Sequence, residues 1–115
     1  MITIPGNNFT EFYFFQNKYY YIYNLTFRCL EIGNLLLKSY YKHLPEYNKL
    51  TGLTEMTVAK ICNGSNLLDE ADYHLDKAEK ILKVTHGNDH SRLTKDCQLI
   101  RKSINLNRKM ININT

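Results

Sequence analysis

One apolar spacing occurs three times in this chain, and it constrains the fold more than any other feature. The positions are separated by four, three and four residues, which keeps their side chains on one face of a 3.6-residue helix. No strand-like alternation of comparable length competes with this pattern. The sequence therefore predicts an all-α fold with three main helices. The three stripes are Leu25, Cys29, Ile32 and Leu36; Ala71, Leu75, Ala78 and Leu82; and Leu93, Cys97, Ile100 and Ile104.

The helix around the second stripe has the best local support. Acidic residues enrich its first turn, which suits the positive end of the helix dipole. Acid-before-base pairs at i,i+4 follow on its outer face. Ser65 or Asn66 is the expected N-cap. The charged residues in these patterns are Asp69, Glu70, Asp72, Asp76 with Lys80, and Glu79 with Lys83.

Residues 83–91, "KVTHGNDHS", join the second and third predicted helices. Gly87 ends one helix at little steric cost, and Asp89 or Asn88 caps the next. His86 and His90 have metal-ligand spacing, but Gly87 interrupts the helix face between them and Asp89 is the one other ligand nearby. We therefore expect a tight helix–helix joint with no bound metal. Its predicted members are Thr85, His86, Gly87, Asp89 and His90.

The first helix begins within "NKYYYIYNL" and ends before Pro45, because the residue preceding a proline avoids helical geometry. The connection after it is weakly patterned, with a short helix considered around Leu53 to Cys62 and a turn at Asn63-Gly64. The tyrosines at 19–23 are expected to flank a core rather than to stack on bases. The predicted segments are a poorly ordered 1–17, a helical domain at 18–104 with an insertion at about 45–67, and a frayed tail at 105–115.

Length and cysteine content limit the class of protein. A chain of 115 residues is one domain or part of one. The three cysteines form no C-x-x-C pair, so neither a structural zinc nor a dithiol redox site is expected, and we interpret the thiols as small core residues. No secretory leader and no membrane span are expected. These features favour an intracellular protein of the cytoplasm or nucleus.

The positive charge is concentrated at the C-terminal end. Residues 92–115 carry six basic side chains and one acidic side chain, whereas residues 1–91 carry nine basic and ten acidic ones. A basic helix can attract phosphate backbones. No aromatic residue is interleaved with these charges, so a solvated helix face is the favoured interpretation and nucleic acid is not an expected partner.

Small residues at fixed helical positions resemble the tetratricopeptide repeat, which packs two antiparallel helices closely. Cys29, the Ile32-Gly33 pair and Leu36 match the first helix of that repeat, and the second stripe matches its second helix. About two dozen residues stand where the repeat has a tight turn. The resemblance predicts a partial solenoid of helix pairs. The expected packing positions are Ile32, Gly33, Leu36, Ala71, Leu75 and Ala78.

The segment "LLDEADYHLDKAEKILKVTHGNDHSRL" is more specific. It resembles the C-terminal helical domain of the SET/MYND (SMYD) protein-lysine methyltransferases, in which a helix ends in a "VTHG-x-(D/E)-H" joint. "LEIGNLLL" at 30–37 is similar to the preceding helix of that family, so the resemblance covers about residues 18–104. Kinesin-light-chain-like repeats share a "G-x-D-H" joint and remain an alternative. Val84, Thr85 and His86 favour the SET/MYND family.

The family's chemistry is not expected here. Its members transfer a methyl group from S-adenosylmethionine through a SET domain that carries a zinc-bearing MYND module, and this chain contains neither motif set. We expect a non-catalytic helical scaffold or protein-interaction region, with no cofactor, no catalytic residue and a protein partner of unknown identity. The alternative is part of a methyltransferase whose catalytic lobe lies on a longer product. Catalysis through His86 and His90 with Cys97 is a weaker hypothesis, because Cys97 lies on a predicted core stripe.

Two further expectations concern partners. Some tetratricopeptide domains hold terminal carboxylates with a lysine and an asparagine. Asn34 matches the asparagine and is a candidate partner contact, although Leu30 occupies the lysine position. The chain offers about one and a half repeats, and repeats bury their apolar faces on neighbours. We therefore expect self-association or dependence on another chain.

Overall fold

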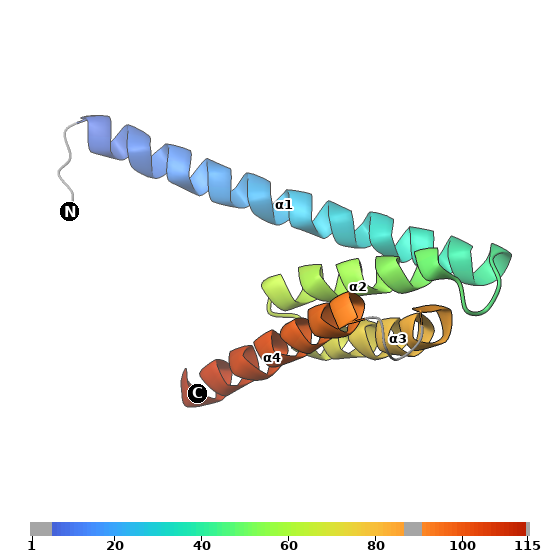
Figure 1. Ribbon diagram of the computed structural model, residues 1–115. Coiled ribbons are helices and arrows are strands. Elements are labelled where there is room, and N and C mark those ends of the chain that lie inside the picture. The colour runs from blue at the N-terminus through green and yellow to red at the C-terminus, as the bar shows by residue number, and fades with distance from the viewer. Residues whose placement is uncertain (1–5, 87–90, 115) are drawn as a thin grey trace.

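The computed structural model describes residues 6–86 and 91–114, and over these ranges the chain forms four helices and no strand (Figure 1). They are α1 (Gly6–His43), α2 (Lys49–Gly64), α3 (Leu68–His86) and α4 (Ser91–Asn114). Consecutive helices run in opposite directions (Figure 1). The all-α prediction is confirmed, with one helix more than the three main helices that were expected.

Helix α1 ends at His43, before Pro45 as predicted, and a short connection leads to α2. Asn48 is the N-cap of α2, and its Oδ1 accepts a hydrogen bond of 2.8 Å from the backbone N–H of Leu50. This bond satisfies one of the donors that every helix start leaves free. The connection between α1 and α2 is therefore a tight helical hairpin.

Asn66 ends α2 rather than starting α3. It has a φ of 62°, and its N–H donates to Asn63 O at 3.2 Å. The N–H of Leu67 donates to Cys62 O at 2.9 Å, which completes the Schellman arrangement. The prediction of Ser65 or Asn66 as an N-cap is wrong, because both residues belong to the C-terminal cap of α2.

Residues 45–67, predicted to be an insertion, contain a helix that begins at Lys49 and ends at Gly64. This helix, α2, packs on α1, α3 and α4 and forms its most extensive interface with α3. Periodicity indicated only a short helix here, around Leu53 to Cys62, because three of the buried residues, Thr51, Gly52 and Glu55, are not large apolar residues. The other buried residues of α2 are Met56, Val58, Ala59 and Cys62.

The predicted stripes of α3 and α4 are confirmed. Ala71, Leu75 and Ala78 are completely buried, and Leu82 is buried beside them. On α4 the buried positions are Cys97, Ile100 and Ile104, with Leu93 packed at the edge. Two side-chain hydrogen bonds also join α4 to α2. The amide of Asn63 donates to Ser103 and accepts from Asn107, each at 2.9 Å.

The predicted stripe of α1 is not the buried one. Ile32 and Leu36 are 57% and 41% exposed, and Leu25 and Cys29 are also exposed. The side of α1 that packs on α2 is shifted by one residue, which rotates the helix by about 100°. Both faces are apolar, so spacing alone could not distinguish them. On this side of α1 lie Leu30, Gly33, Leu37 and Tyr40, of which Gly33 and Leu37 are buried and Leu30 and Tyr40 are partly buried.

Helix α1 is much longer than the helix that supports it. It has 38 residues against 16 in α2, or about 57 Å against 24 Å at 1.5 Å per residue. Its N-terminal half extends past α2 with no helix of the described chain beside it (Figure 1). Residues 6–17, predicted to be poorly ordered, are part of this helix, and residues 1–5 lie outside the described residues. Residues 105–114, predicted to be a frayed tail, are the last turns of α4.

Candidate interaction site

Gly33 sets the distance between α1 and α2. It is buried, and a Cβ at this position would lie 2.8 Å from Cγ2 of Val58 on α2. Because Val58 is itself buried and β-branched, it has little freedom to move away. Gly33 was predicted as a packing position, and the structure places it in the α1–α2 interface.

Beside this close approach lies an open groove of about 390 Å³. One wall is the exposed stripe of α1, and the other is the adjacent face of α2. Thr54 and Thr57 supply the hydroxyl groups on an otherwise mainly apolar surface, and the Thr57 hydroxyl already donates to Leu53 O at 3.0 Å. We call this feature the α1/α2 groove. It is lined by Cys29, Ile32, Gly33, Leu36, Leu53, Thr54, Thr57, Val58 and Ile61.

The predicted site residues therefore fall into two groups. Ala71, Leu75 and Ala78 lie in the core between helices, whereas Ile32 and Leu36 line the α1/α2 groove. Asn34, the candidate partner contact, is exposed on α1 but does not line this groove. The tetratricopeptide pattern pairs the first stripe with the second, but among the described residues α1 packs on α2, which in turn packs on α3.

The predicted joint is described only in part. Thr85 lies in the last turn of α3, where its hydroxyl donates to Ile81 O at 3.1 Å, and His86 is the last residue of that helix. Gly87, Asp89 and His90 lie outside the described residues. Within the described ranges, no group of three or more histidine, cysteine or acidic side chains could hold a metal ion.

The α2–α3 interface contains a buried ionisable pair that the sequence did not reveal. Glu55 is 1% exposed, and its two carboxylate oxygens lie 3.2 and 3.3 Å from Nδ1 of His74. Burying a carboxyl group without a partner costs free energy of folding. The contact with His74 offsets that cost for Glu55 in this interface. Neither residue carries a local sequence pattern, because the two positions meet only through the packing of α2 on α3.

A second polar cluster borders the same interface. Nζ of Lys77 lies 5.0 Å from the ring centre of Tyr41 on α1 and 4.5 Å from that of Tyr73. The hydrogen bond with Tyr73 raises the pKa of Lys77. Burial, with a further contribution from the charge of Glu55, raises the pKa of the Tyr41 hydroxyl. Lys77 therefore remains a cation and links α3 to α1 through cation–π contacts.

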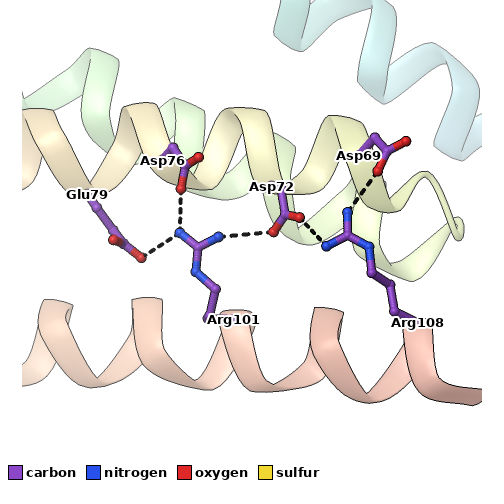
Figure 2. Close-up of polar contacts among 6 residues, drawn as sticks. All are labelled: Asp69, Asp72, Asp76, Glu79, Arg101 and Arg108. Carbon is purple, nitrogen blue, oxygen red and sulfur yellow. Dashed lines mark hydrogen bonds and ion pairs between the residues drawn. The ribbon is translucent and has the colours of Figure 1, made fainter.

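Four carboxylates of α3 face two arginines of α4 (Figure 2). Arg101 donates to Asp72 at 3.0 Å, to Asp76 at 2.6 Å and to Glu79 at 3.0 Å. Its guanidinium is partly buried, which lowers the pKa, but the bonds to Asp76 and Glu79 outweigh this and raise it. The sequence predicted that Asp76 and Glu79 pair with lysines of the same helix, and it did not predict Arg101 of α4 as their partner.

Arg108 extends the same ladder by two turns of α4. It donates to Asp69 at 2.8 Å and also contacts Asp72, which therefore bridges both arginines (Figure 2). The sequence did contain a pattern, since the acids of α3 recur at steps of three, four and three and the two arginines are seven residues apart. Each set lies on one helix face. Part of the basic charge of residues 92–115 is thus neutralised within the protein.

The three thiols have different environments. Cys62 and Cys97 are buried, as expected for small core residues, whereas Cys29 is exposed in the α1/α2 groove, which corrects the prediction for that thiol. Burial raises the pKa of Cys62 to about 11 and also raises that of Cys97. Cys97 lies 3.9 Å from Sδ of Met56 in the core.

Among the described helices, none combines the length and apolar character that a membrane crossing requires. No family model matches the chain, and no curated protein or solved structure gives a significant match to it.

Proposed function

We propose that the chain is a non-catalytic helical interaction module that binds an apolar helix of a protein partner in the α1/α2 groove. The observation that carries this proposal is the exposed apolar stripe of α1 beside α2. Leucine and isoleucine side chains that are about half exposed along one groove are typical of a surface that a partner covers. The groove between two antiparallel helices has the shape that a third helix fills in helical repeats.

Two features support a non-catalytic role over an enzyme. A cysteine nucleophile needs a lowered pKa and an accessible thiol. Cys97, the thiol considered for catalysis with His86 and His90, is buried and its pKa is raised. The buried Glu55 is hydrogen-bonded to His74, which gives it a structural role between α2 and α3.

The ionic ladder weakens the case for nucleic-acid binding. Arg101 and Arg108 are paired with carboxylates of α3, so a phosphate would have to displace those contacts. Lys95, Lys102 and Lys109 remain exposed on α4. They are spaced by seven residues, which is also usual for a solvated helix face.

The relationship to the C-terminal domain of SET/MYND proteins remains a prediction that rests on the "KVTHGNDHS" joint. A kinesin-light-chain-like repeat is its alternative, and part of a longer methyltransferase is a third. The groove proposal rests on the exposed stripe of α1 and does not depend on choosing between them.

Site-specific photo-crosslinking in cells that express the full chain tests the proposal. A benzoylphenylalanine at Leu36, inside the groove, should give a discrete protein adduct, and Thr57→Arg should remove it by placing a charged side chain across the groove. Thr94→Arg, at an exposed position of α4, adds the same charge and should leave the adduct unchanged. If no adduct forms from Leu36, or if Thr57→Arg has no effect on it, the proposal is wrong.

A further inference from the structure

The side of α4 that points away from the core carries two parallel rows of residues, one of lysines and one of apolar residues. Each row repeats every seven residues, and the two rows alternate at steps of four and three, which keeps both on one helix face. At about 100° per residue, this face lies about 180° around α4 from its buried stripe. We call it the α4 outer face. Its rows are Lys95, Lys102 and Lys109, and Leu99, Leu106 and Ile113.

No helix of the described chain covers the α4 outer face. Leu99, Leu106 and Ile113 are 62%, 59% and 80% exposed, and the three lysines are exposed beside them. Met110 is 55% exposed and widens the apolar row by one residue. A helix face that is only solvated carries polar residues between its charges, whereas this one carries large apolar side chains. Such a patch with a charged edge is typical of a surface that binds a partner.

We propose that the α4 outer face binds an amphipathic helix of a partner protein that carries carboxylates every seven residues beside an apolar stripe. The seven-residue repeat favours a helix as partner, because two helices stay in contact along such a repeat by winding around each other. The two apolar stripes pack together, and the lysines at the edge meet the carboxylates of the partner. This surface is separate from the α1/α2 groove, since α4 does not contact α1 within the described chain.

Charge decides which kind of helix fits. The one acid of α4, Asp96, lies a seven-residue step from Ser103, on the side of the helix where Ser103 bonds Asn63 of α2. The acids of α3 are paired with Arg101 and Arg108, which point away from the lysine row (Figure 2). The α4 outer face is therefore purely cationic. The same face of a second copy would set lysine against lysine, and like charges repel, whereas an acidic helix is complementary.

The apolar row distinguishes an acidic helix from other negatively charged surfaces. A nucleic-acid backbone attracts lysines but leaves Leu99, Leu106 and Ile113 in water. A helix that lies in a bilayer surface has a broad apolar face, often with aromatic residues, and residues 91–114 contain no Phe, Tyr or Trp. The narrow row on α4 has the width of a seam between two helices. It spans about 21 Å from Leu99 to Ile113, which a partner helix of about four turns covers.

Fluorescence anisotropy with the full chain and a synthetic peptide tests the proposal. The probe is a four-heptad peptide with leucine at its seam positions and glutamate beside them, and the control peptide has lysine in place of glutamate. We expect the chain to bind the glutamate peptide and not the lysine peptide. Lys102→Glu should weaken binding about threefold to tenfold, and Leu106→Gln about tenfold. Lys38→Glu, the same charge change at an exposed position of α1, should leave binding unchanged.

Charge reversal tests the recognition itself. Lys95→Glu, Lys102→Glu and Lys109→Glu together should abolish binding of the glutamate peptide and create binding of the lysine peptide, with an unchanged thermal melt because all three side chains are exposed. A wild-type chain that does not bind the glutamate peptide, or a triple variant that keeps the wild-type preference, would overturn the proposal. So would binding of phosphatidylserine vesicles through Lys102 and Leu106 by a chain that ignores the peptide. The Leu36 adduct tests the groove independently of all these results.

Discussion

Nη2 of Arg101 lies 2.6 Å from Oδ1 of Asp76, and the same guanidinium also donates to Asp72 and Glu79, so one α4 side chain pairs with three α3 carboxylates. Arg101→Leu leaves these acids facing one another. We expect a loss of about 1–2 kcal/mol of unfolding free energy. Urea titration should show that the loss is smaller in high salt, because salt screens the remaining repulsion. Lys102→Leu, at the exposed neighbouring position, is the control, and an equal loss there would contradict the ladder's role.

The close approach of α2 to α3 depends on Gly52. A Cβ at this position would lie 2.9 Å from Cγ2 of Ile81 and 2.9 Å from Cδ2 of Leu82, both of which are buried. Gly52→Ala should therefore destabilise the fold by about 1–2 kcal/mol, since overpacking exceeds the gain in helix propensity. At Gly64 nothing lies within 4 Å of an added Cβ, so Gly64→Ala should be neutral or slightly stabilising. Thermal melts of both variants check the contrast, and equal shifts would contradict it.

Asn66 holds a left-handed conformation at the end of α2, with a φ of 62°. Glycine adopts this conformation without the steric penalty of a Cβ. Asn66→Gly should therefore stabilise the protein by about 0.5–1 kcal/mol in urea unfolding. Asn66→Val should destabilise it, because a β-branched residue suits this region poorly. A glycine variant that is less stable than wild type would contradict this prediction. It would mean that the Asn66 side chain adds more to the free energy of unfolding than the left-handed backbone conformation subtracts.

Thiol reactivity should separate Cys29 from the other two cysteines. At pH 8 the native protein should react with one equivalent of a disulfide reagent quickly, at Cys29, and with Cys62 and Cys97 only upon unfolding. Rapid reaction of all three thiols in the native protein would contradict the burial of α2 and α4.

The same thiols make stability depend on pH. The pKa of Cys62 is about 11 in the folded protein against 9.0 for an unperturbed thiol, so the folded state keeps its proton while the unfolded state loses it. The contribution is complete below pH 9 and is lost between pH 9 and 11. Urea midpoints should fall over that window less steeply in Cys62→Ala than in wild type. An unchanged slope would contradict the raised pKa.

The sequence predicted α3 and α4 well, because each carries large apolar residues on one stripe and charges elsewhere. It indicated only a short helix in place of α2, in which Thr51, Gly52 and Glu55 occupy buried positions that an apolar pattern does not include. On α1 the helix was predicted but its orientation was not, since two neighbouring stripes are both apolar. The stripe that faces α2 includes Gly33, whose lack of a side chain leaves room for Val58 of α2.

The candidate site could be predicted only in part for the same reason. Ile32 and Leu36 were identified from their spacing, but their role changes from core contacts to groove lining when α1 is rotated by one residue. The pairing of Glu55 with His74 and of Arg101 with the α3 acids depends on helices that meet in space. The spacing of the charges indicated that the acids lie on one face of α3 and the arginines on one face of α4. It could not indicate that these two faces meet.

The orientation of α1 is the central claim, because it makes the α1/α2 groove available to a partner. In a Cys29→Ser background, the thiol-labelling rates of Leu36→Cys and Leu37→Cys test this orientation. Position 36 lines the groove, whereas position 37 is buried. At high dilution we expect Leu36→Cys to react at close to the unfolded rate and Leu37→Cys about a hundredfold more slowly, since Leu37 is 4% exposed. Equal rates, or faster labelling at position 37, would contradict the orientation and with it the groove.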